Sequence, residues 1–370
     1  MTKRLVSTPK KDGFRMPGEF EKHEKTWMIW PEKADNWRYC AKPVQKVFIQ
    51  VAKEISKFEP VVVCASSLQY QNALKSLGNN IQVIEMSSDD MWIRDTGPAF
   101  LVDDKGNLRA VDWEFNAWGG LEYGLYSSWD KDNQIAKKIC ELENIDLYKI
   151  DDFVLEGGSI HVDGEGTCIV TQACLLHKGR NPHLSKNEID QNLKNFLNVE
   201  KIIWLENGIY LDETDEHVDN ILHFIAPATV VLAWTDDKND PQYEMSKKAF
   251  DLLSSQKDSK GREFKIHKLY LPNPPITVTE EEAMGCDLVK EEIPKKKGDR
   301  QAASYANFLI VNGGVILPIF NVKEDKIAVE TLQKVLPNHK IVTINSREIL
   351  LGGGNIHCIT QQQPLKVTKK

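Results

Sequence analysis

The chain has 370 residues, of which 47 are basic and 54 are acidic, so its formal net charge is −7. With 41% hydrophobic and 27% charged residues, the composition is that of a globular protein and excludes disordered and collagen-like chains. The mild acidic excess argues against a nucleic-acid binder, which needs a basic face. A chain of this length buries a large core without disulfides or a structural metal. Length alone suggests two or three domains.

The sequence points to a cytoplasmic enzyme or binding protein. The N-terminal segment MTKRLVSTPKKDG lacks the apolar region of a secretory signal. No run approaches the ~20 apolar residues of a membrane-spanning helix, so no membrane association is expected. An odd number of irregularly spaced cysteines is typical of a reducing compartment. These cysteines are Cys40, Cys64, Cys140, Cys168, Cys174, Cys286 and Cys358.

Short apolar strands, turns and helical patterns alternate along the chain. The first part is expected to contain a helix at 44–58, strands at 61–65 and 81–85, and a hairpin in PAFLVDDKGNLRAVDWEF. Next come a helix at 133–142, a strand at 148–154, a hairpin around DGEG, a helix at 187–196 and a strand at 201–205. The last part holds hairpins around APAT and NGG, a helix at 326–335 and a strand at 340–344.

The order hairpin, helix, strand recurs, which predicts repeated units packed around an axis. The hairpin turns near Lys105, Glu165, Ala228 and Gly313 are separated by about 60, 63 and 85 residues. The last interval is lengthened by the charged, proline-rich segment 271–300, which we interpret as an active-site loop rather than a linker. A less regular unit at TWMIWPEKADNWRYC begins the series. Four or five such units form one closed domain, so a single domain replaces the estimate from length.

Common nucleotide and metal signatures are missing from the sequence. It contains no phosphate-binding loop, no strand–GxGxxG–helix fingerprint, no CxxC pair and no HExxH. The triplet HVD occurs at 161–163 and 217–219, but isolated histidines and aspartates more often form structural hydrogen bonds. We therefore expect neither a metal nor a cofactor.

Cys358 is the candidate nucleophile because it follows the glycine-rich run GGGNIH. Glycines let the backbone approach a ligand closely. Asp95, Glu156 and His217 are separated by 61 and 61 residues, close to the repeat period, and Asp219 follows His217. Residues one period apart occupy similar places in a repeated fold, so these side chains are expected to converge.

A thiol among carboxylates favours one kind of chemistry. Carboxylates raise the pKa of a thiol and oppose the thiolate that a cysteine protease needs. A guanidinium cation held by those carboxylates reverses the effect, because its charge stabilises the thiolate. The thiolate then attacks the guanidinium carbon with an imidazole as the acid–base partner. These residues therefore favour hydrolysis or transfer of a guanidine group.

Segments along nearly the whole chain resemble the agmatine deiminase family, whose members are pentein enzymes that modify guanidino groups. The matching segments are FRMPGEFEKHEKTWMIWPEKADNWR, EMSSDDMWIRDTGPAF, LEGGSIHVDGEGT, DETDEHVDN, AASYANF and GGGNIHCITQQQP, which span roughly residues 13–364. The resemblance implies a single-domain, five-bladed pseudo-symmetric α/β propeller of ββαβ repeats. It also implies that a homodimer or larger homo-oligomer hydrolyses agmatine to N-carbamoylputrescine and ammonia, without a cofactor, in putrescine biosynthesis.

The resemblance also implies a role for each candidate catalytic residue. Cys358 is expected to be the nucleophile and His217 the general acid–base. Asp95 and Asp219 are expected to clamp the guanidinium nitrogens, with Glu156 orienting His217 or assisting the clamp.

The same resemblance implies a set of substrate-binding residues. Trp92 is expected along the methylene chain, and Asp212 or Glu213 at the distal amine. Asp90 and Gly353 complete the expected set. Within the superfamily, a peptidylarginine or arginine deiminase and an amidinotransferase remain alternatives. Outside it, a non-catalytic binding protein is disfavoured by the intact reactive residues.

Overall fold

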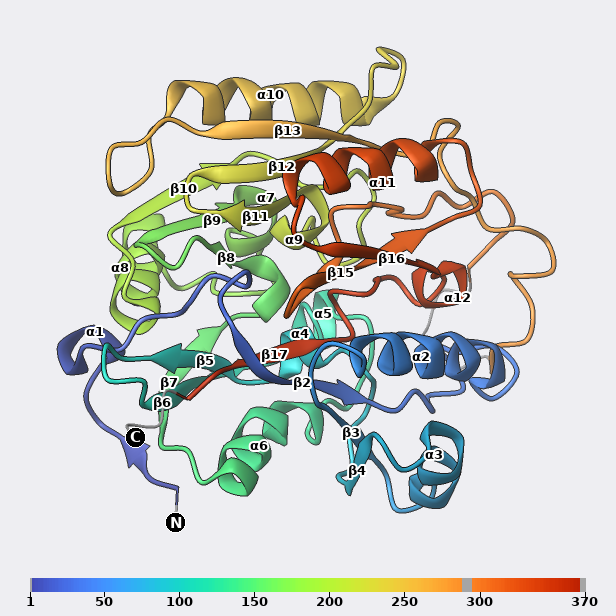
Figure 1. Ribbon diagram of the computed structural model, residues 1–370, viewed down its shortest axis with the longest axis horizontal. Helices are drawn as coiled ribbons and strands as arrows, with labels where there is room; N and C mark the ends of the chain where they lie inside the picture. Colours follow the sequence, from blue (N-terminus) through green and yellow to red (C-terminus); the bar gives the residue numbers. More distant parts are fainter. Residues whose placement is uncertain (1, 288–294, 367–370) are drawn as a thin grey trace.

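The structure, a computed structural model, describes residues 2–287 and 295–366. Within these ranges the strands form five sheets, each with an antiparallel pair extended by a parallel strand (Figure 1). Sheet I is β17 (Gln361–Pro364), β2 (His23–Ile29), β3 (Val61–Ala65) and β4 (Gln82–Glu85). Sheet II is β1 (Arg4–Leu5), β7 (Leu147–Val154), β6 (Leu108–Glu114) and β5 (Ala99–Val102).

The other three sheets each have three strands in the part of the chain described. Sheet III is β10 (Lys201–Leu205), β9 (Thr167–Thr171) and β8 (His161–Val162). Sheet IV is β11 (Leu222–Ala226), β12 (Thr229–Trp234) and β13 (Lys265–Tyr270). Sheet V is β14 (Leu309–Val311), β15 (Gly314–Ile319) and β16 (Lys340–Asn345). Sheet I differs in its assembly, because its antiparallel pair joins a C-terminal strand to an N-terminal one.

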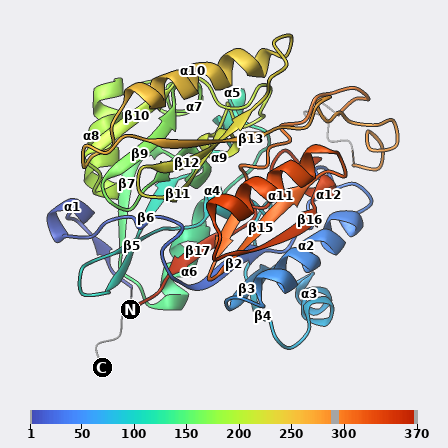
Figure 2. The ribbon, with the colours of Figure 1, turned by 45° about the horizontal axis from the view of Figure 1, so that its top comes forward.

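One long helix precedes the parallel strand in each sheet, so sheets II to V contain the order ββαβ, and sheet I reaches the same arrangement with β17 supplied from the C-terminal end. Helices α8, α10 and α6 lie at the periphery of the molecule (Figure 1), and α11 lies over β15 and β16 beside α2 (Figure 2). The five helices are α2 (Lys42–Ile55), α6 (Ile135–Glu143), α8 (Lys186–Leu197), α10 (Pro241–Ser255) and α11 (Glu324–Val335).

The sequence of α2 and β3 shows why such a unit forms. Val44, Phe48, Val51 and Ile55 recur at helical spacing and are all buried. This apolar stripe packs on the sheet and leaves a polar face in solvent. The strand that follows is VVVCA, which is buried at every position because other chain segments cover both of its faces.

The four helices expected from the apolar pattern are confirmed, with ends displaced by a few residues. The elements that were not predicted include α3 (Tyr70–Leu77), α10 and β13. The buried positions of α10 are Gln242, Ser246, Ala249 and Leu253, so three of its four inward residues are polar or small. Its apolar pattern is therefore weak.

The segment 271–300 is only partly described, because residues 288–294 lie outside the described ranges. In the described part Thr277 forms an antiparallel bridge with Arg300. Glu282 forms an ion pair with Arg347, which ties this segment to the C-terminal part of the chain. Across the described ranges, no helix is both long and apolar enough to cross a bilayer.

Candidate functional site

Three of the candidate catalytic residues lie just before an edge strand, namely β5 of sheet II, β8 of sheet III and β11 of sheet IV. Asp95 lies in the one-turn helix α4 (Ile93–Thr96), which precedes β5. Glu156 precedes the 3-10 turn η2 (Gly157–Ser159) and β8. His217 precedes α9 (Val218–Ile221), a turn of helix where an extended strand was expected, and then β11. Both α4 and α9 contact η2, so the 61-residue spacing reflects equivalent positions in neighbouring units.

Gly158 is the point at which three of these side chains meet. Its backbone N–H donates to Asp95 Oδ1 at 2.8 Å. A Cβ atom at this position would stand 2.6 Å from His217 Nδ1 and 3.0 Å from Asp219 Oδ2. Only glycine leaves room for this approach. Its role was not assigned from the sequence, although the motif LEGG contains it.

Cys358 lies beside two of the acids and lines a cavity of about 550 Å³. Its Sγ atom is 3.9 Å from Asp219 Oδ2. Burial raises the pKa of the Cys358 thiol well above its usual value, and the charges of Asp219 and Asp95 raise it further. The thiol is therefore neutral in the free site, and a bound cation would favour its ionisation.

His217 lies between two carboxylates. Its Nδ1 atom is 3.9 Å from Asp95 Oδ1, and its Nε2 atom is 3.7 Å from Glu156 Oε2. Burial alone would lower the pKa of His217, but the neighbouring Asp95 carboxylate holds it well above its usual value. Burial raises the pKa of Asp95 to about 6, with the charges of Asp219 and Glu156 acting in the same direction. At neutral pH the imidazole is therefore protonated and able to donate a proton.

Asp219 has one oxygen that lies near the thiol and another that has no hydrogen-bond partner among the described residues. Its Oδ2 atom lies 2.8 Å from Nδ1 of His357, while the buried Oδ1 atom has no hydrogen-bond partner among the described residues. Burial would raise the pKa of Asp219, but the His357 hydrogen bond lowers it below its usual value. An ionised carboxylate with a free oxygen is a suitable acceptor for a guanidinium N–H.

Arg180 fixes Glu156 and was not recognised from the sequence. Its Nε atom donates to Glu156 Oε1 at 2.7 Å, and both side chains are fully buried. Burial opposes ionisation of Glu156, but the Arg180 guanidinium lowers the pKa of that carboxyl below its usual value. Arg180 also donates to the backbone carbonyls of Trp118 and Thr214, so it ties three segments together behind His217.

Aromatic side chains form one wall of the cavity, and Trp92 is among them. The ring of Trp92 lies 5.4 Å from that of Trp37 and 6.5 Å from that of Trp118. Trp118 Nε1 donates to Asp95 Oδ2 at 2.9 Å, which joins the aromatic wall to one of the candidate catalytic acids. Trp37 and Trp118 are further residues of the site that sequence reasoning missed.

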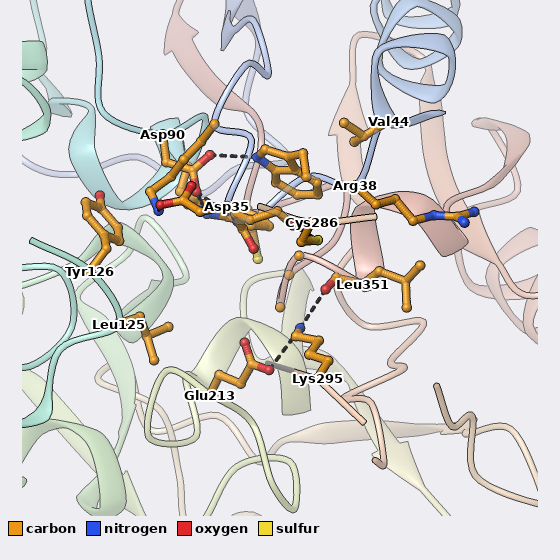
Figure 3. A pocket seen from close by; sticks show the side chains of 18 of the residues that line it. Asp35, Arg38, Val44, Asp90, Leu125, Tyr126, Glu213, Cys286, Lys295 and Leu351 are labelled. Carbon is orange, nitrogen blue, oxygen red and sulfur yellow. Dashed lines mark hydrogen bonds and ion pairs between the residues drawn. The ribbon is translucent and has the colours of Figure 1, made fainter. Parts of the chain in front are cut away.

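Asp90, which was expected among the substrate-binding residues, also lines the cavity. Its oxygens accept hydrogen bonds from Trp37 Nε1 at 2.9 Å, from Trp92 Nε1 at 3.0 Å and from the Asn36 side chain at 2.9 Å. Figure 3 shows Asp90 directed at an indole ring. With these bonds made, Asp90 holds the two indole rings in place.

The two acids expected at the distal amine lie in different environments. Asp212 is absent from the lining of the cavity, and its oxygens accept hydrogen bonds from the Thr214 side chain, the Asn220 side chain and the backbone N–H of His217. This carboxylate positions the backbone that carries His217. Glu213 lies on the cavity wall and forms an ion pair with Lys295 at 2.9 Å.

Gly353 lies opposite Glu213 and has a φ of +104°, a backbone conformation that side chains rarely adopt. A Cβ atom there would stand 2.5 Å from Glu213 Oε2. Lys295 donates to the carbonyl of Leu351 as well as to Glu213, as the dashed lines in Figure 3 show. Lys295, in the 271–300 segment, therefore lies at the cavity beside the glycine-rich run GGG at 352–354.

Two groups of described side chains contain residue types that can bind a metal ion. Each has donor atoms within 4.8 Å of one another: His161, His223 and His357, and Glu156, Cys174 and His217. A buried guanidinium lies beside each group. In the first, Arg94 lies 3.5 Å from Glu19, which contacts both His223 and His357. In the second, Arg180 binds Glu156. That positive charge opposes a divalent cation.

Comparison with known proteins gives consistent matches over the whole chain. Residues 15–364 match the family described as Porphyromonas-type peptidyl-arginine deiminase. An agmatine deiminase of Pseudomonas aeruginosa is 57% identical over 360 residues, covering 97% of this chain and 98% of that protein.

Solved structures agree with these matches. An agmatine deiminase of Enterococcus faecalis has a TM-score of 0.97 at 52% identity, covering 99% of this chain and 100% of that one. A C. jejuni agmatine deiminase, a cysteine-to-serine variant with substrate bound, has a TM-score of 0.80 at 30% identity, covering 96% and 97%. The mixed α/β fold is therefore that of these enzymes.

Proposed function

The chain belongs to the Porphyromonas-type peptidyl-arginine deiminase family, and we propose that it hydrolyses the guanidinium group of agmatine to N-carbamoylputrescine and ammonia. The observation that carries this proposal is a buried thiol, that of Cys358, beside Asp219 and Asp95 at the wall of a cavity. The agmatine deiminases of P. aeruginosa and E. faecalis, each more than half identical over nearly the whole chain, support it.

The acids explain why the substrate is a cation. Asp219 Oδ1 is buried without a hydrogen-bond partner in the described structure, and a guanidinium N–H supplies one. A cation bound between Asp95 and Asp219 offsets the two charges that keep the Cys358 thiol neutral. Substrate binding thus favours the thiolate, so the nucleophile forms only when its target is present.

On substrate binding the Cys358 thiol loses its proton to solvent, because His217 is already protonated, and in the first half of the reaction the thiolate forms a bond to the guanidinium carbon. His217, protonated beside Asp95, gives its proton to the nitrogen that leaves. The carbon–nitrogen bond breaks, ammonia departs, and a cationic amidino-thioether remains on Cys358. Asp95 and Asp219 face this cation as they faced the guanidinium.

In the second half a water molecule adds to the same carbon while the neutral His217 accepts its proton. The carbon–sulfur bond then breaks, the electron pair returns to Cys358 as thiolate, and the hydroxyl proton passes through solvent to the departed ammonia as the carbonyl of N-carbamoylputrescine forms and the product leaves. The sum is one guanidinium and one water converted to one urea group and one ammonium ion. The steps require side chains and water, with no cofactor, and the product is a precursor for putrescine synthesis.

The charge of the cavity favours agmatine over arginine. Among its described lining residues, eight are acidic (Asp35, Asp90, Asp95, Glu213, Glu282, Asp287, Asp299 and Glu348) and three are basic (Lys33, Arg38 and Lys295). Agmatine carries a second positive charge at its amine, whereas free arginine also carries a carboxylate, which an acidic cavity repels. Glu213, on the wall with an exposed edge, is the residue we propose for the distal amine.

A substrate panel tests the proposal with ammonia release as the readout. Agmatine, free arginine and a peptidyl-arginine are compared at equal concentration, and agmatine is expected to be turned over fastest. Release from arginine alone would overturn the assignment, and release from the peptide alone would favour a peptidylarginine deiminase. Transfer of the amidino group to an added amine, in place of hydrolysis, would identify an amidinotransferase.

We also propose that the five sheets are the blades of a closed propeller, built as one catalytic domain over residues 1–370 with its core at about 13–364. The long helices link sheets pairwise in support of this arrangement. α10 contacts β10 of sheet III, α11 contacts β13 of sheet IV, and α2 contacts β16 of sheet V. β17 of sheet I contacts β5 of sheet II, and α8 shares an apolar cluster with sheet II. A single cooperative unfolding transition is expected by calorimetry.

The assembly and compartment complete the proposal. We propose a homodimer or larger homo-oligomer in the cytoplasm. All seven cysteines are free thiols, as a reducing compartment favours. Analytical ultracentrifugation measures the oligomer, and a monomer at all concentrations would contradict it. Cell fractionation measures the location.

A further inference from the structure

Asn307 touches the sulfur of Cys358. Its side chain is fully buried, and its Nδ2 atom lies 3.2 Å from Cys358 Sγ. The same Nδ2 atom donates to Asn220 Oδ1 at 3.0 Å. In the sequence Asn307 lies in the motif AASYANF, which by itself indicates no role for this residue.

The orientation of the Asn307 amide follows from its other contacts. Its Oδ1 atom accepts hydrogen bonds from the backbone N–H groups of His357 at 3.0 Å and Cys358 at 3.3 Å. A backbone N–H can only donate, so the amide oxygen must face these two groups. The NH₂ group is thereby directed at Cys358 Sγ and Asn220 Oδ1, and a flipped amide would lose the two backbone hydrogen bonds and the one to Asn220.

The position of Asn307 in the fold matches that of the other reactive residues. It lies just before β14, an edge strand of sheet V. Asp95, Glu156 and His217 precede edge strands of sheets II, III and IV, and Cys358 precedes β17, an edge strand of sheet I. Each of the five sheets therefore contributes a residue from the same place, and Asn307 is the contribution of sheet V.

We propose that Asn307 is a catalytic residue, whose side-chain N–H donates a hydrogen bond to the Cys358 thiolate when it forms and when it leaves the amidino intermediate. The inference rests on the proposed function, in which Cys358 is the nucleophile. A hydrogen bond to an ionised sulfur is stronger than one to a neutral thiol, so it stabilises the reactive form selectively.

The charges that face the thiol make such a donor necessary. Asp219 and Asp95 oppose the thiolate by charge, and Arg94 is the buried cation whose charge interacts with Cys358 favourably. Asn307 adds a dipole that favours the thiolate without attracting the substrate cation away from the acids. In the neutral thiol, the S–H group has Asn307 Oδ1 as an acceptor at 3.4 Å.

Asn307 is also joined to the acid–base residue through hydrogen bonds. Asn220, which accepts from Asn307, donates from its own side chain to Asp212 Oδ2 at 2.9 Å. The same oxygen accepts the backbone N–H of His217 at 3.1 Å. This series of hydrogen bonds fixes the position of Asn307, which donates to Cys358, relative to the backbone of His217.

The decisive variant is Asn307→Asp, which keeps the shape and the Oδ1 acceptor and replaces the donor with a second oxygen. The reactivity of Cys358 is measured on the folded enzyme with iodoacetamide at a fixed pH, because the rate follows the thiolate fraction. Alkylation is quantified by mass spectrometry on the tryptic peptide Glu348–Lys366, in which Cys358 is the one cysteine. Turnover of agmatine is measured in parallel.

We expect Asn307→Asp to alkylate more than tenfold more slowly than the parent enzyme, with kcat reduced at least in proportion and KM changed less than about threefold. Asn307→Ala, the second variant, is expected to lose about tenfold, which corresponds to one unit of thiol pKa. Asn312→Asp, the same substitution at the hairpin turn after β14, is the control and is expected to match the parent. A merely structural role would lower stability and leave the thiol reactivity of the folded enzyme unchanged.

Parent-like alkylation and kcat in both Asn307 variants would overturn this inference, while the function would stand if Cys358→Ala is inactive. Ammonia release by Cys358→Ala would instead overturn the proposed function itself. If Asn307→Asp does not fold, Asn307→Ala alone decides between the two outcomes.

Discussion

His217 Nδ1 lies 3.9 Å from Asp95 Oδ1, with both side chains buried against Gly158. Each changes the proton affinity of the other: the Asp95 carboxylate raises the pKa of His217, and the imidazolium opposes the increase that burial gives to the pKa of Asp95. At neutral pH the pair is an imidazolium beside a carboxylate. When the pH falls through the pKa of Asp95, this carboxylate is protonated and the pair loses its negative charge.

The first prediction concerns the acidic side of the dependence of the reaction rate on pH. Asp95 has a pKa of about 6, raised from its usual value by burial, so it is charged above that pH and neutral below it. Protonation removes one of the two charges that we propose hold the guanidinium. We expect kcat/KM for agmatine to fall about tenfold per pH unit below about pH 6. Steady-state rates between pH 5 and pH 8 check this, and a profile flat down to pH 5 would contradict it.

The second prediction is that Cys358→Ala abolishes ammonia release from agmatine, because no carbon–sulfur bond can form. Removing one sulfur from the cavity wall leaves the sheets and their packing in place, so the thermal midpoint is expected to change little. Ammonia assays and circular dichroism measure the two quantities. Activity near that of the parent would exclude the covalent mechanism.

The third prediction separates binding from chemistry at His217. His217→Gln removes the proton donor but keeps a polar side chain of similar size between Asp95 and Glu156. We expect kcat to fall by about 10² to 10⁴, with KM changed only a few-fold. Steady-state kinetics with agmatine provide both numbers. A change confined to KM would make His217 a binding residue.

The fourth prediction compares neighbouring acids, Glu213 and Asp212. Glu213→Gln removes a charge from the cavity wall and is expected to raise KM for agmatine about tenfold. For butylguanidine, which lacks the amine, KM is expected to stay unchanged. Asp212→Asn instead loosens the backbone of His217 and is expected to lower kcat for both compounds. The opposite pattern, with KM raised in Asp212→Asn alone, would place the amine at Asp212.

The fifth prediction is that Gly158→Ala reduces kcat/KM at least about a hundredfold. Its Cβ atom would stand 2.6 Å from His217 Nδ1, so a reacting group must move, and small displacements are costly in catalysis. Gly313→Ala is the matched control, because its Cβ atom meets open space at a φ of +83°. That variant is expected to lose about 1 kcal/mol of stability and to keep its activity. Equal activity in the two variants would contradict the packing argument.

Much of the fold could be predicted because apolar strands and turn residues mark each hairpin. The turn at Gly313 and the fully buried strand at Val61–Ala65 are examples. The helix α10 was missed because its buried stripe is polar or small, so the apolar period is weak. Its start carried a usable signal, since Asp240 caps the helix and Pro241 occupies its first turn.

The candidate site could be predicted where the repeat is regular. Equal spacing places Asp95, Glu156 and His217 before edge strands of three sheets. Asn307 could not be found in this way, because the segment 271–300 enlarges the interval before it and the period no longer applies. Arg180 has no repeat equivalent, and its partners come from three separate loops, so only the three-dimensional structure shows its contact with Glu156.

The antiparallel pairing of β17 with β2 joins the C-terminal strand to the N-terminal one. Cys358 lies just before β17, and its carbonyl accepts a hydrogen bond from the backbone N–H of Arg94. The sheet that carries the reactive sulfur is therefore complete only when the two ends of the folded domain have met. In the closed propeller proposed above, Cys358 is expected to reach its reactive surroundings only when the chain is fully folded, so its thiol is expected to be unreactive toward guanidines in a partly folded chain.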